Sequence, residues 1–307
     1  MTRPIEKISI IGAGALGATY ASLLFAMDPR SVRFISGKDR YDKLCKEGVF
    51  VNGRHYPIEV VRPGEEKPAD LVIVAVKHYH LDQAIQQIRR AVGAQTTILS
   101  VMNGIDSEER IGAVYGADKV LYGLALAIDA QRKGNSVAYK NLGRIVFGEK
   151  ENTVLTDRVR RVGDLFTRAG IIYEIAPDMV RSLWFKFMIN VGVNQVSAVL
   201  GANFGRLKKS EEAMKLMEGA MREVIAIAKA LNVNLGEEDL EEWRRIHDEL
   251  DPEGKTSMLQ DVEGGRPTEV EMLAGTVIAY GKRLGVATPV NQELFDALKR
   301  ISPGADR

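Results

Sequence analysis

The sequence has a single cysteine, Cys45, among its 307 residues. One cysteine can form neither an intrachain disulfide nor a cysteine-rich zinc site, and this favours a reducing compartment. Neither sign of charge is in excess, because the sequence has 42 Lys and Arg residues and 41 Asp and Glu residues. Without a positive surplus to neutralise phosphates, we expect no nucleic-acid partner.

Long hydrophobic runs are also missing. The first apolar run begins at Ile8, after a polar start with no hydrophobic region for a signal peptide. The longest obvious apolar run, residues 71–76, is far shorter than the ~20 residues of a membrane-spanning helix. The composition, with 45% hydrophobic and 27% charged residues, is that of a globular protein with a sizeable core. We therefore expect a cytoplasmic protein with no membrane partner.

The first half of the chain alternates short apolar, β-branched runs with longer mixed segments, which is typical of parallel strands joined by helices. The predicted strands are 8–11, 32–36, 71–76, 97–101, 120–125, 136–140, 144–148 and 171–175, and the predicted helices include 15–27 and 156–169. From residue 120 onward we expect some strands to be antiparallel. The pattern predicts an α/β domain with a doubly wound, Rossmann-type sheet over residues 1–176.

After Pro177 the strand pattern gives way to apolar residues at helical spacing. Helices are predicted over 178–200, 210–231 and 237–250, and Gly-Gly-Arg-Pro at 264–267 separates two further helical stretches. The sequence therefore predicts two domains with different roles. Residues 1–176 would bind a dinucleotide, and the all-α residues 177–307 would bind substrate.

A glycine-rich segment lies directly between the first predicted strand and the first predicted helix. It consists of Gly12, Ala13, Gly14, Ala15, Leu16 and Gly17. In the dinucleotide fingerprint the first glycine permits a tight turn, the second lets a pyrophosphate approach the backbone, and the third lets helix and strand pack closely. The helix N-terminus adds partly positive amides. We therefore expect the segment to bind a dinucleotide, although ordinary glycine turns share this spacing.

The end of the second predicted strand bears on the choice of cofactor. A carboxylate there would bind the ribose 2′-hydroxyl of NAD, and the sequence has none at that point. Lys38 and Arg40 follow instead and could bind the 2′-phosphate of NADP(H). The alternative is that both cations are solvated at the start of the next helix.

The predicted helix over 178–200 is mostly apolar but carries a polar stripe. At ~3.6 residues per turn, Lys186, Asn190 and Asn194 lie on one side, with Ser197 close to them. Burying an ammonium or amide group without hydrogen-bond partners costs free energy, so the presence of these polar residues on an apolar helix has to be explained. It is either a ligand-facing wall or a set of solvated or interhelical hydrogen-bonding groups.

Three residues of the second half are candidates for acid and substrate-orienting roles. A lysine in a partly dry cleft can donate a proton at neutral pH, so Lys186 is the candidate acid. Ser257 and Glu269 lie around a predicted helix break and offer a hydroxyl and a carboxylate. Their structural alternatives are a helix cap for Ser257 and a favourable helix start for Glu269.

Taken together, these residues resemble the ketopantoate reductase (2-dehydropantoate 2-reductase) family. The resemblance covers nearly the whole chain and involves several motifs in order. They are Gly-Ala-Gly-Ala-Leu-Gly at 12–17, Val-Lys at 76–77, Asn-Gly at 103–104, Trp-Phe-Lys at 184–186 with Asn190 and Asn194, Ser-Met-Leu-Gln-Asp at 257–261, Thr-Glu at 268–269 and Gly-Val-Ala-Thr-Pro at 285–289. The fold it implies is like that of 6-phosphogluconate dehydrogenase.

The resemblance implies NADPH-dependent reduction of the keto acid 2-dehydropantoate to pantoate, in the biosynthesis of pantothenate and coenzyme A. Lys186 matches the family's general acid, and Glu269 matches a carboxylate that orients the substrate beside the cofactor. Substrate contacts are implied for Asn190, Asn194 and Ser257. Lys77 and Asn103 match positions beside the cofactor, Asn103 also near the substrate, although locally they could be a strand end and a turn.

Two positions depart from the family pattern. Gly37 stands where many members have an arginine for the 2′-phosphate, so tolerance of NADH is expected. Phe204 stands where some members have a substrate-binding asparagine, with Asn203 next to it, so substrate preference could differ. His78 and His80 have no metal-ligand pattern around them and are expected at the surface.

Two other functions remain open on the sequence. One is a related NAD(P)-dependent 2-keto acid or hydroxy-acid dehydrogenase, and the other is a regulator that senses NADP(H) without catalysis. The apolar helical faces of the second half fit either a core or a homodimer surface.

Overall fold

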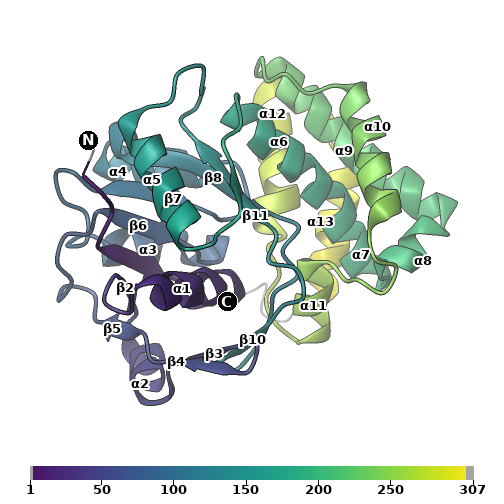
Figure 1. Ribbon diagram of the computed structural model, residues 1–307. Helices are drawn as coiled ribbons and strands as arrows, with labels where there is room; N and C mark the ends of the chain where they lie inside the picture. Colours follow the sequence, from purple (N-terminus) through teal and green to yellow (C-terminus); the bar gives the residue numbers. More distant parts are fainter. Residues whose placement is uncertain (1–2, 302–307) are drawn as a thin grey trace. The chain divides into compact units, whose positions relative to one another are not determined.

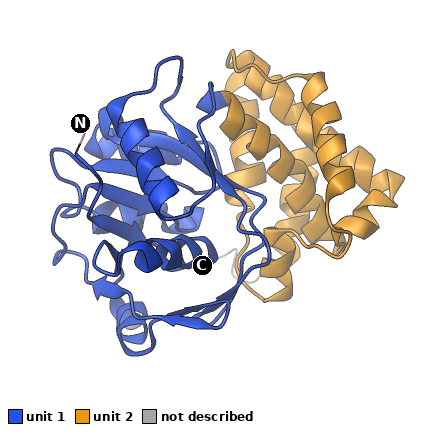
Figure 2. Cartoon of the chain, in the orientation of Figure 1, with its two compact units in different colours: residues 1–180 blue, residues 181–307 orange. Residues whose placement is uncertain are grey.

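A computed structural model describes residues 3–301 of the chain and divides into two compact units. Unit 1 comprises residues 1–180 and unit 2 comprises residues 181–307 (Figure 2). The division between Val180 and Arg181 lies close to the boundary predicted near Ala176.

Unit 1 is built on an eight-stranded sheet with the order β12-β11-β8-β7-β6-β1-β2-β5 (Figure 1). Its strands are β1 (Ile8–Ile11), β2 (Val32–Ile35), β5 (Glu59–Val61), β6 (Leu71–Val74), β7 (Thr97–Ser100), β8 (Val120–Leu126), β11 (Arg144–Gly148) and β12 (Tyr173–Glu174). Strand β1 pairs in parallel with both β2 and β6, whereas β11 runs antiparallel to β8. The predicted Rossmann-type sheet, partly antiparallel beyond residue 120, is confirmed.

Helices cover both faces of this sheet, which explains why its central strands β1, β6 and β7 are buried along their whole length. The unit 1 helices are α1 (Ala15–Met27), α2 (Lys38–Glu47), the 3-10 turn η1 (His78–His80), α3 (Leu81–Gln87), α4 (Ser107–Tyr115), the 3-10 turn η2 (Ala117–Lys119) and α5 (Asp157–Arg168). In β6, Ile73 packs in one core cluster with residues of α1 and α5, and Val74 packs in a second cluster with residues of α3 and α4. Alternate side chains therefore face different helix layers.

A second, four-stranded sheet joins distant parts of unit 1 in the order β4-β3-β10-β9. Its strands are β3 (Val49–Val51), β4 (Arg54–Tyr56), β9 (Gln131–Lys133) and β10 (Ser136–Ala138). Strand β10 pairs in parallel with β3 and antiparallel with β9. The strand predicted over 136–140 thus ends at Ala138 and belongs to this small sheet.

Unit 2 is all-α in its described part, as predicted. Its elements are α6 (Met179–Ile189), which begins at the boundary, the π-helical η3 (Asn190–Asn194), α7 (Gln195–Leu200), α8 (Phe204–Lys208), α9 (Glu211–Ala230), α10 (Glu237–Glu249), α11 (Ser257–Glu263), the π-helical η4 (Glu271–Gly275), α12 (Thr276–Leu284) and α13 (Pro289–Ile301). The helix predicted over 178–200 is continuous but contains the π-helical segment η3.

The stretch Met179–Leu200 passes a membrane-span test of length and composition, with a mean hydropathy of 1.2 over its most apolar window. However, 61% of that window is buried in the structure, and α9, α11 and α13 contact η3 or α7. A central core helix of a folded domain passes the same test, so the apolar composition is weak evidence for a membrane.

Candidate functional site

The glycine-rich turn between β1 and α1 has the shape that the fingerprint requires. Gly12 has a φ of +106°, and a Cβ atom there would overlap the carbonyl oxygen of Ala75. A Cβ atom at Gly17 would likewise overlap the carbonyl oxygen of Gly12. At Gly14 the nearest atom would be 4.0 Å away, so the fold itself leaves room there. The open position at Gly14 fits a pyrophosphate lying against the backbone.

The first turn of α1 lies directly behind this opening. Gly14 is the N-cap of α1 and has no side chain to bond the first amides, while its carbonyl accepts from the amide of Ala18 at 3.0 Å. The helix has 13 residues, and its N-terminal amides carry partial positive charge. Together with the space at Gly14, this end of α1 is suited to a phosphate group.

The two cations after β2 behave differently from one another. Lys38 is exposed at the start of α2, with a φ of +50°. Arg40 is half-buried, and its Nη2 donates to the carbonyl oxygen of Ala13 at 2.8 Å. Its Nη1 donates to Oδ1 of Asn135 at 2.6 Å. Arg40 is therefore attached to the glycine-rich turn, and the alternative of a solvated cation is wrong for it.

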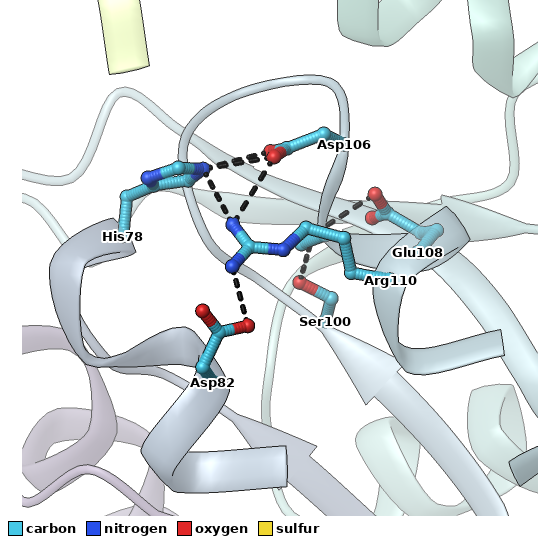
Figure 3. Close-up of polar contacts among 7 residues, drawn as sticks. His78, Asp82, Ser100, Asp106, Glu108 and Arg110 are labelled. Carbon is cyan, nitrogen blue, oxygen red and sulfur yellow. Dashed lines mark hydrogen bonds and ion pairs between the residues drawn. The ribbon is translucent and has the colours of Figure 1, made fainter. Parts of the chain in front are cut away.

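Lys77 and Asn103 follow the adjacent strands β6 and β7. A polar cluster that includes His78, Asp106 and Arg110 follows them in the chain (Figure 3). Nε2 of His78 lies 2.9 Å from Oδ2 of Asp106, and Nη1 of Arg110 lies 3.3 Å from the same oxygen. Burial alone would raise the pKa of Asp106, but the bonds and charges of His78 and Arg110 lower it. His78 is thus only partly exposed within this cluster, whereas His80, also expected at the surface, is exposed.

A second set of polar groups near this cluster is buried in the core. Ser107 donates from Oγ to Oε2 of Glu108 at 2.9 Å, and the hydroxyls of Ser100 and Ser107 are 2.7 Å apart (Figure 3). Burial raises the pKa of Glu108 to about 7, although the hydrogen bonds that it accepts act in the opposite direction. A change in the charge of this buried carboxyl is therefore expected near neutral pH.

Unit 2 carries the predicted polar stripe on α6 and η3. Lys186, Asn190 and Asn194 are each partly exposed, whereas Val191 and Val193 between them are buried. Nδ2 of Asn194 lies 3.4 Å from Oδ1 of Asn190, so the two amides face the same side. The two asparagines begin and end a π-helical turn, a feature that is frequent at functional sites.

Ser257 is fixed relative to this stripe through its neighbours. Thr256 caps α11, because its Oγ1 accepts from the amide of Leu259 at 3.1 Å. The same hydroxyl donates to Oγ of Ser197 at 3.1 Å, and Ser197 donates to the carbonyl of Ala202 at 2.7 Å. The cap is therefore Thr256 rather than Ser257, and Ser257 is exposed at the first position of α11. Ser197, fully buried, joins α7 to α11.

Glu269 lies two residues before the second π-helical segment of unit 2. It is 8% exposed, and its carbonyl accepts from the amide of Leu273 at 3.0 Å. The segment η4 that follows contacts η3. Thus the described part of unit 2 brings the segment of Glu269 next to the segment of Asn190 and Asn194.

The two departures from the family pattern have clear local structures. Gly37 has a φ of −115°, and a Cβ atom there would meet its nearest neighbours, in Gln87 and Pro63, at 3.6 and 3.7 Å. A Cβ atom is therefore accommodated there. The Asn203 side chain accepts from the amide of Arg206 at 3.0 Å and caps α8, so its amide is committed to the fold.

Sequence reasoning missed Arg132, which donates from Nη1 to the carbonyl oxygen of Ala13 at 3.3 Å. Its only signal in the sequence was a cation in a short polar segment. Among residues 3–301, no group of three His, Cys, Asp or Glu side chains is arranged to hold a metal ion.

Comparison with known proteins identifies the family. The model described as Ketopantoate reductase PanE/ApbA matches residues 8–152, and the model for its C-terminal part matches residues 178–302. The chain belongs to the ketopantoate reductase family. Membership makes it an oxidoreductase and confirms the resemblance inferred from its motifs.

Individual relatives span both units of the chain. The 2-dehydropantoate 2-reductase of Aquifex aeolicus is 25% identical over 302 residues, 96% of each chain. The solved structure of that enzyme from Geobacter metallireducens is 30% identical, covers 96% of this chain and 100% of its own, and has a TM-score of 0.85. A complex of D-mandelate dehydrogenase with NADH, 22% identical with a TM-score of 0.87 over 96% of this chain and 98% of that one, shares the fold.

Proposed function

We propose that this ketopantoate reductase family member reduces 2-dehydropantoate to pantoate with NADPH, in the biosynthesis of pantothenate and coenzyme A in the cytoplasm. The observation that carries the proposal is the stripe of Lys186, Asn190 and Asn194, partly exposed on a buried helix, with the segment of Glu269 packed beside it. If the stripe were only a solvated helix edge, the neighbouring carboxylate of Glu269 would be expected to face water. Glu269 is instead buried, which favours a ligand-binding role for this region.

The cofactor, when bound, supplies the hydride. The turn over 12–17 and the N-terminus of α1 would hold its pyrophosphate, since Gly14 leaves space there. Lys38 and Arg40 are the proposed cations on the side of the 2′-phosphate, and Lys77 and Asn103 would contact the cofactor from the ends of β6 and β7.

Each polar residue of the unit 2 stripe has a separate role in the proposal. Nζ of Lys186 donates a proton to the carbonyl oxygen of the substrate, which becomes the new hydroxyl group, and it regains the proton from solvent. Asn190, Asn194 and Ser257 hydrogen-bond the hydroxyl and carboxylate groups of the substrate and fix its orientation. Glu269 orients the substrate beside the cofactor.

A related 2-keto acid or hydroxy-acid dehydrogenase is the second candidate. Phe204 favours it, because this side chain replaces a substrate-binding asparagine of some members, and Asn203 beside it is used as a helix cap. The fold shared with D-mandelate dehydrogenase is compatible with it. A third possibility, a non-catalytic sensor of NADP(H), predicts cofactor binding without hydride transfer and leaves Lys186 without a role.

The decisive experiment is a turnover assay with purified protein, NADPH and 2-dehydropantoate, followed by NADPH absorbance. We expect rapid oxidation, and we expect Lys186→Ala to lower kcat by roughly 10²- to 10⁴-fold because it removes the proton donor. The matched control is Lys209→Ala, which removes a lysine from the end of α8 in the same unit. NADPH binding by Lys186→Ala, measured by fluorescence, should stay close to wild type.

Two outcomes separate the alternatives. Turnover with another 2-keto acid but not with 2-dehydropantoate would support the second candidate and reject the first. Tight NADPH binding without oxidation by any keto acid would support the sensor. We further propose a homodimer, which sedimentation of the purified protein tests independently.

A further inference from the structure

The carbonyl oxygen of Ala13, inside the glycine-rich turn, accepts hydrogen bonds from two guanidinium groups. Arg40 donates from Nη2 at 2.8 Å, and Arg132 donates from Nη1 at 3.3 Å. Arg40 belongs to α2, whereas Arg132 belongs to β9 of the small sheet, 119 residues beyond Ala13 in the chain. Two like charges therefore meet at the segment proposed to hold the cofactor phosphates.

Arg40 also holds the turn in place. Its second terminal nitrogen donates to Oδ1 of Asn135, and Asn135 in turn donates to Oε2 of Glu47 at 3.0 Å and to the carbonyl of Gly48 at 3.2 Å. Burial lowers the pKa of Arg40, the charge of Arg132 lowers it further, and Glu47 partly offsets both. Arg40 is thus anchored to the fold on two sides.

Arg132 differs from Arg40 in its exposure and in the strength of its bond. Its side chain is exposed on β9, and its contact with Ala13 is longer than that of Arg40. A guanidinium carries five N–H groups in a planar fork, which matches the oxygens of a phosphate. A phosphate beside the turn would also relieve the repulsion between Arg40 and Arg132.

We propose that Arg132 is a specificity-determining residue that binds the 2′-phosphate of NADPH, while Arg40 fixes the glycine-rich turn against which Arg132 lies. This assignment rests on the proposed use of a nicotinamide cofactor. It gives the chain a cation for the 2′-phosphate from β9, although Gly37 provides no side chain after β2. NADH has no such phosphate, so Arg132 would contribute little to binding NADH.

The test compares the dissociation constants of NADPH and NADH for wild type, Arg132→Ala and Arg132→Lys, by fluorescence titration without keto acid. Loss of a charge-assisted pair should weaken NADPH binding by roughly 10- to 100-fold and leave NADH binding within about twofold. Arg132→Lys should lie in between, because an ammonium keeps the charge without the planar fork. Lys133→Ala is the control, since it removes a charge from the next position of β9, on the opposite face of the strand.

Three results would overturn this assignment. The first is equal weakening of NADPH and NADH binding in Arg132→Ala, which would place Arg132 on the pyrophosphate. The others are unchanged binding of both cofactors in Arg132→Ala and a wild type that binds neither cofactor. Thermal unfolding of each variant shows whether it is folded. Because the titration contains no keto acid, it gives its answer even if 2-dehydropantoate is not the substrate. Failure of the reductase proposal is therefore distinguishable from failure of this one.

Discussion

The carboxylate of Asp106 lies 2.9 Å from Nε2 of His78, and this contact joins the loops that follow β6 and β7. His78 is the residue after Lys77, and Asp106 lies shortly after Asn103. Arg110 of α4 lies against the same carboxylate and also pairs with Asp82 of α3 (Figure 3). The positions of Lys77 and Asn103 therefore depend on a pair of side chains outside the proposed cofactor contacts.

Asp106→Ala removes this contact and is expected to raise the KM for the cofactor by roughly 3- to 10-fold, about the effect of losing one hydrogen bond. The kcat should change much less, because Lys186 is untouched. Initial-rate kinetics over a range of cofactor concentrations measure both values. Asp106→Asn keeps an acceptor oxygen and should recover part of the loss. A purely structural role would instead lower stability and leave KM unchanged in the folded variant.

Glu108 predicts a pH dependence of stability. Because burial raises its pKa to about 7, the folded protein binds more protons than the unfolded chain between the usual carboxyl range and neutrality. The free energy of unfolding therefore falls as pH rises through this window and remains lower above it. Glu108→Gln cannot ionise, so its stability relative to wild type should improve by roughly 2 kcal/mol between pH 5 and pH 8.

Urea denaturation at several pH values checks this expectation. Glu109→Gln is the matched control, because Glu109 is the exposed neighbour on the same helix. Its stability should follow the wild-type pH dependence. Parallel curves for wild type and Glu108→Gln would show that Glu108 keeps one protonation state over the whole range.

The sequence was sufficient to predict the main sheet apart from its edge strand β5, but of the small sheet it predicted only β10. Strand β6 is apolar throughout and β7 has an apolar centre, so their burial on both faces was visible in the residues themselves. In β9 all three side chains are exposed, and β4 is largely exposed, so neither shows an apolar alternation. Their pairing depends on partners far away in the chain, which local patterns do not encode.

The candidate site likewise has parts that the sequence could predict and parts that it could not. The spacing of the glycines and of the Lys186 stripe reflects local geometry, since a turn and a helix place those residues by sequence distance alone. The contact of His78 with Asp106 joins residues 28 positions apart, and that of Arg132 with Ala13 joins residues 119 positions apart. Such pairs form only when the sheets have assembled, so no local sequence motif predicts them.

Gly37→Arg is expected to strengthen the preference for NADPH over NADH by roughly 10-fold, as one added charge-assisted contact to the 2′-phosphate would do. The backbone at Gly37 is extended, and a Cβ atom there meets only ordinary contacts, so the variant should fold. Cofactor titrations measure the ratio, with Gly37→Ala as control. In an Arg132→Ala background the same change should restore part of the lost NADPH binding. A preference that does not move would show that residue 37 faces away from the phosphate.

Thr256→Val should affect both stability and substrate binding. Valine keeps the shape of threonine but removes the cap of α11 and the bond to Ser197, with an expected loss of about 1–2 kcal/mol in unfolding free energy. Since Ser257 is the next residue, its hydroxyl should become less well placed, and the KM for the keto acid should rise by several-fold. Denaturation and initial rates measure the two effects. Thr256→Ser retains the hydroxyl and should restore both, whereas reduced stability with an unchanged KM would mean that Ser257 does not contact the substrate.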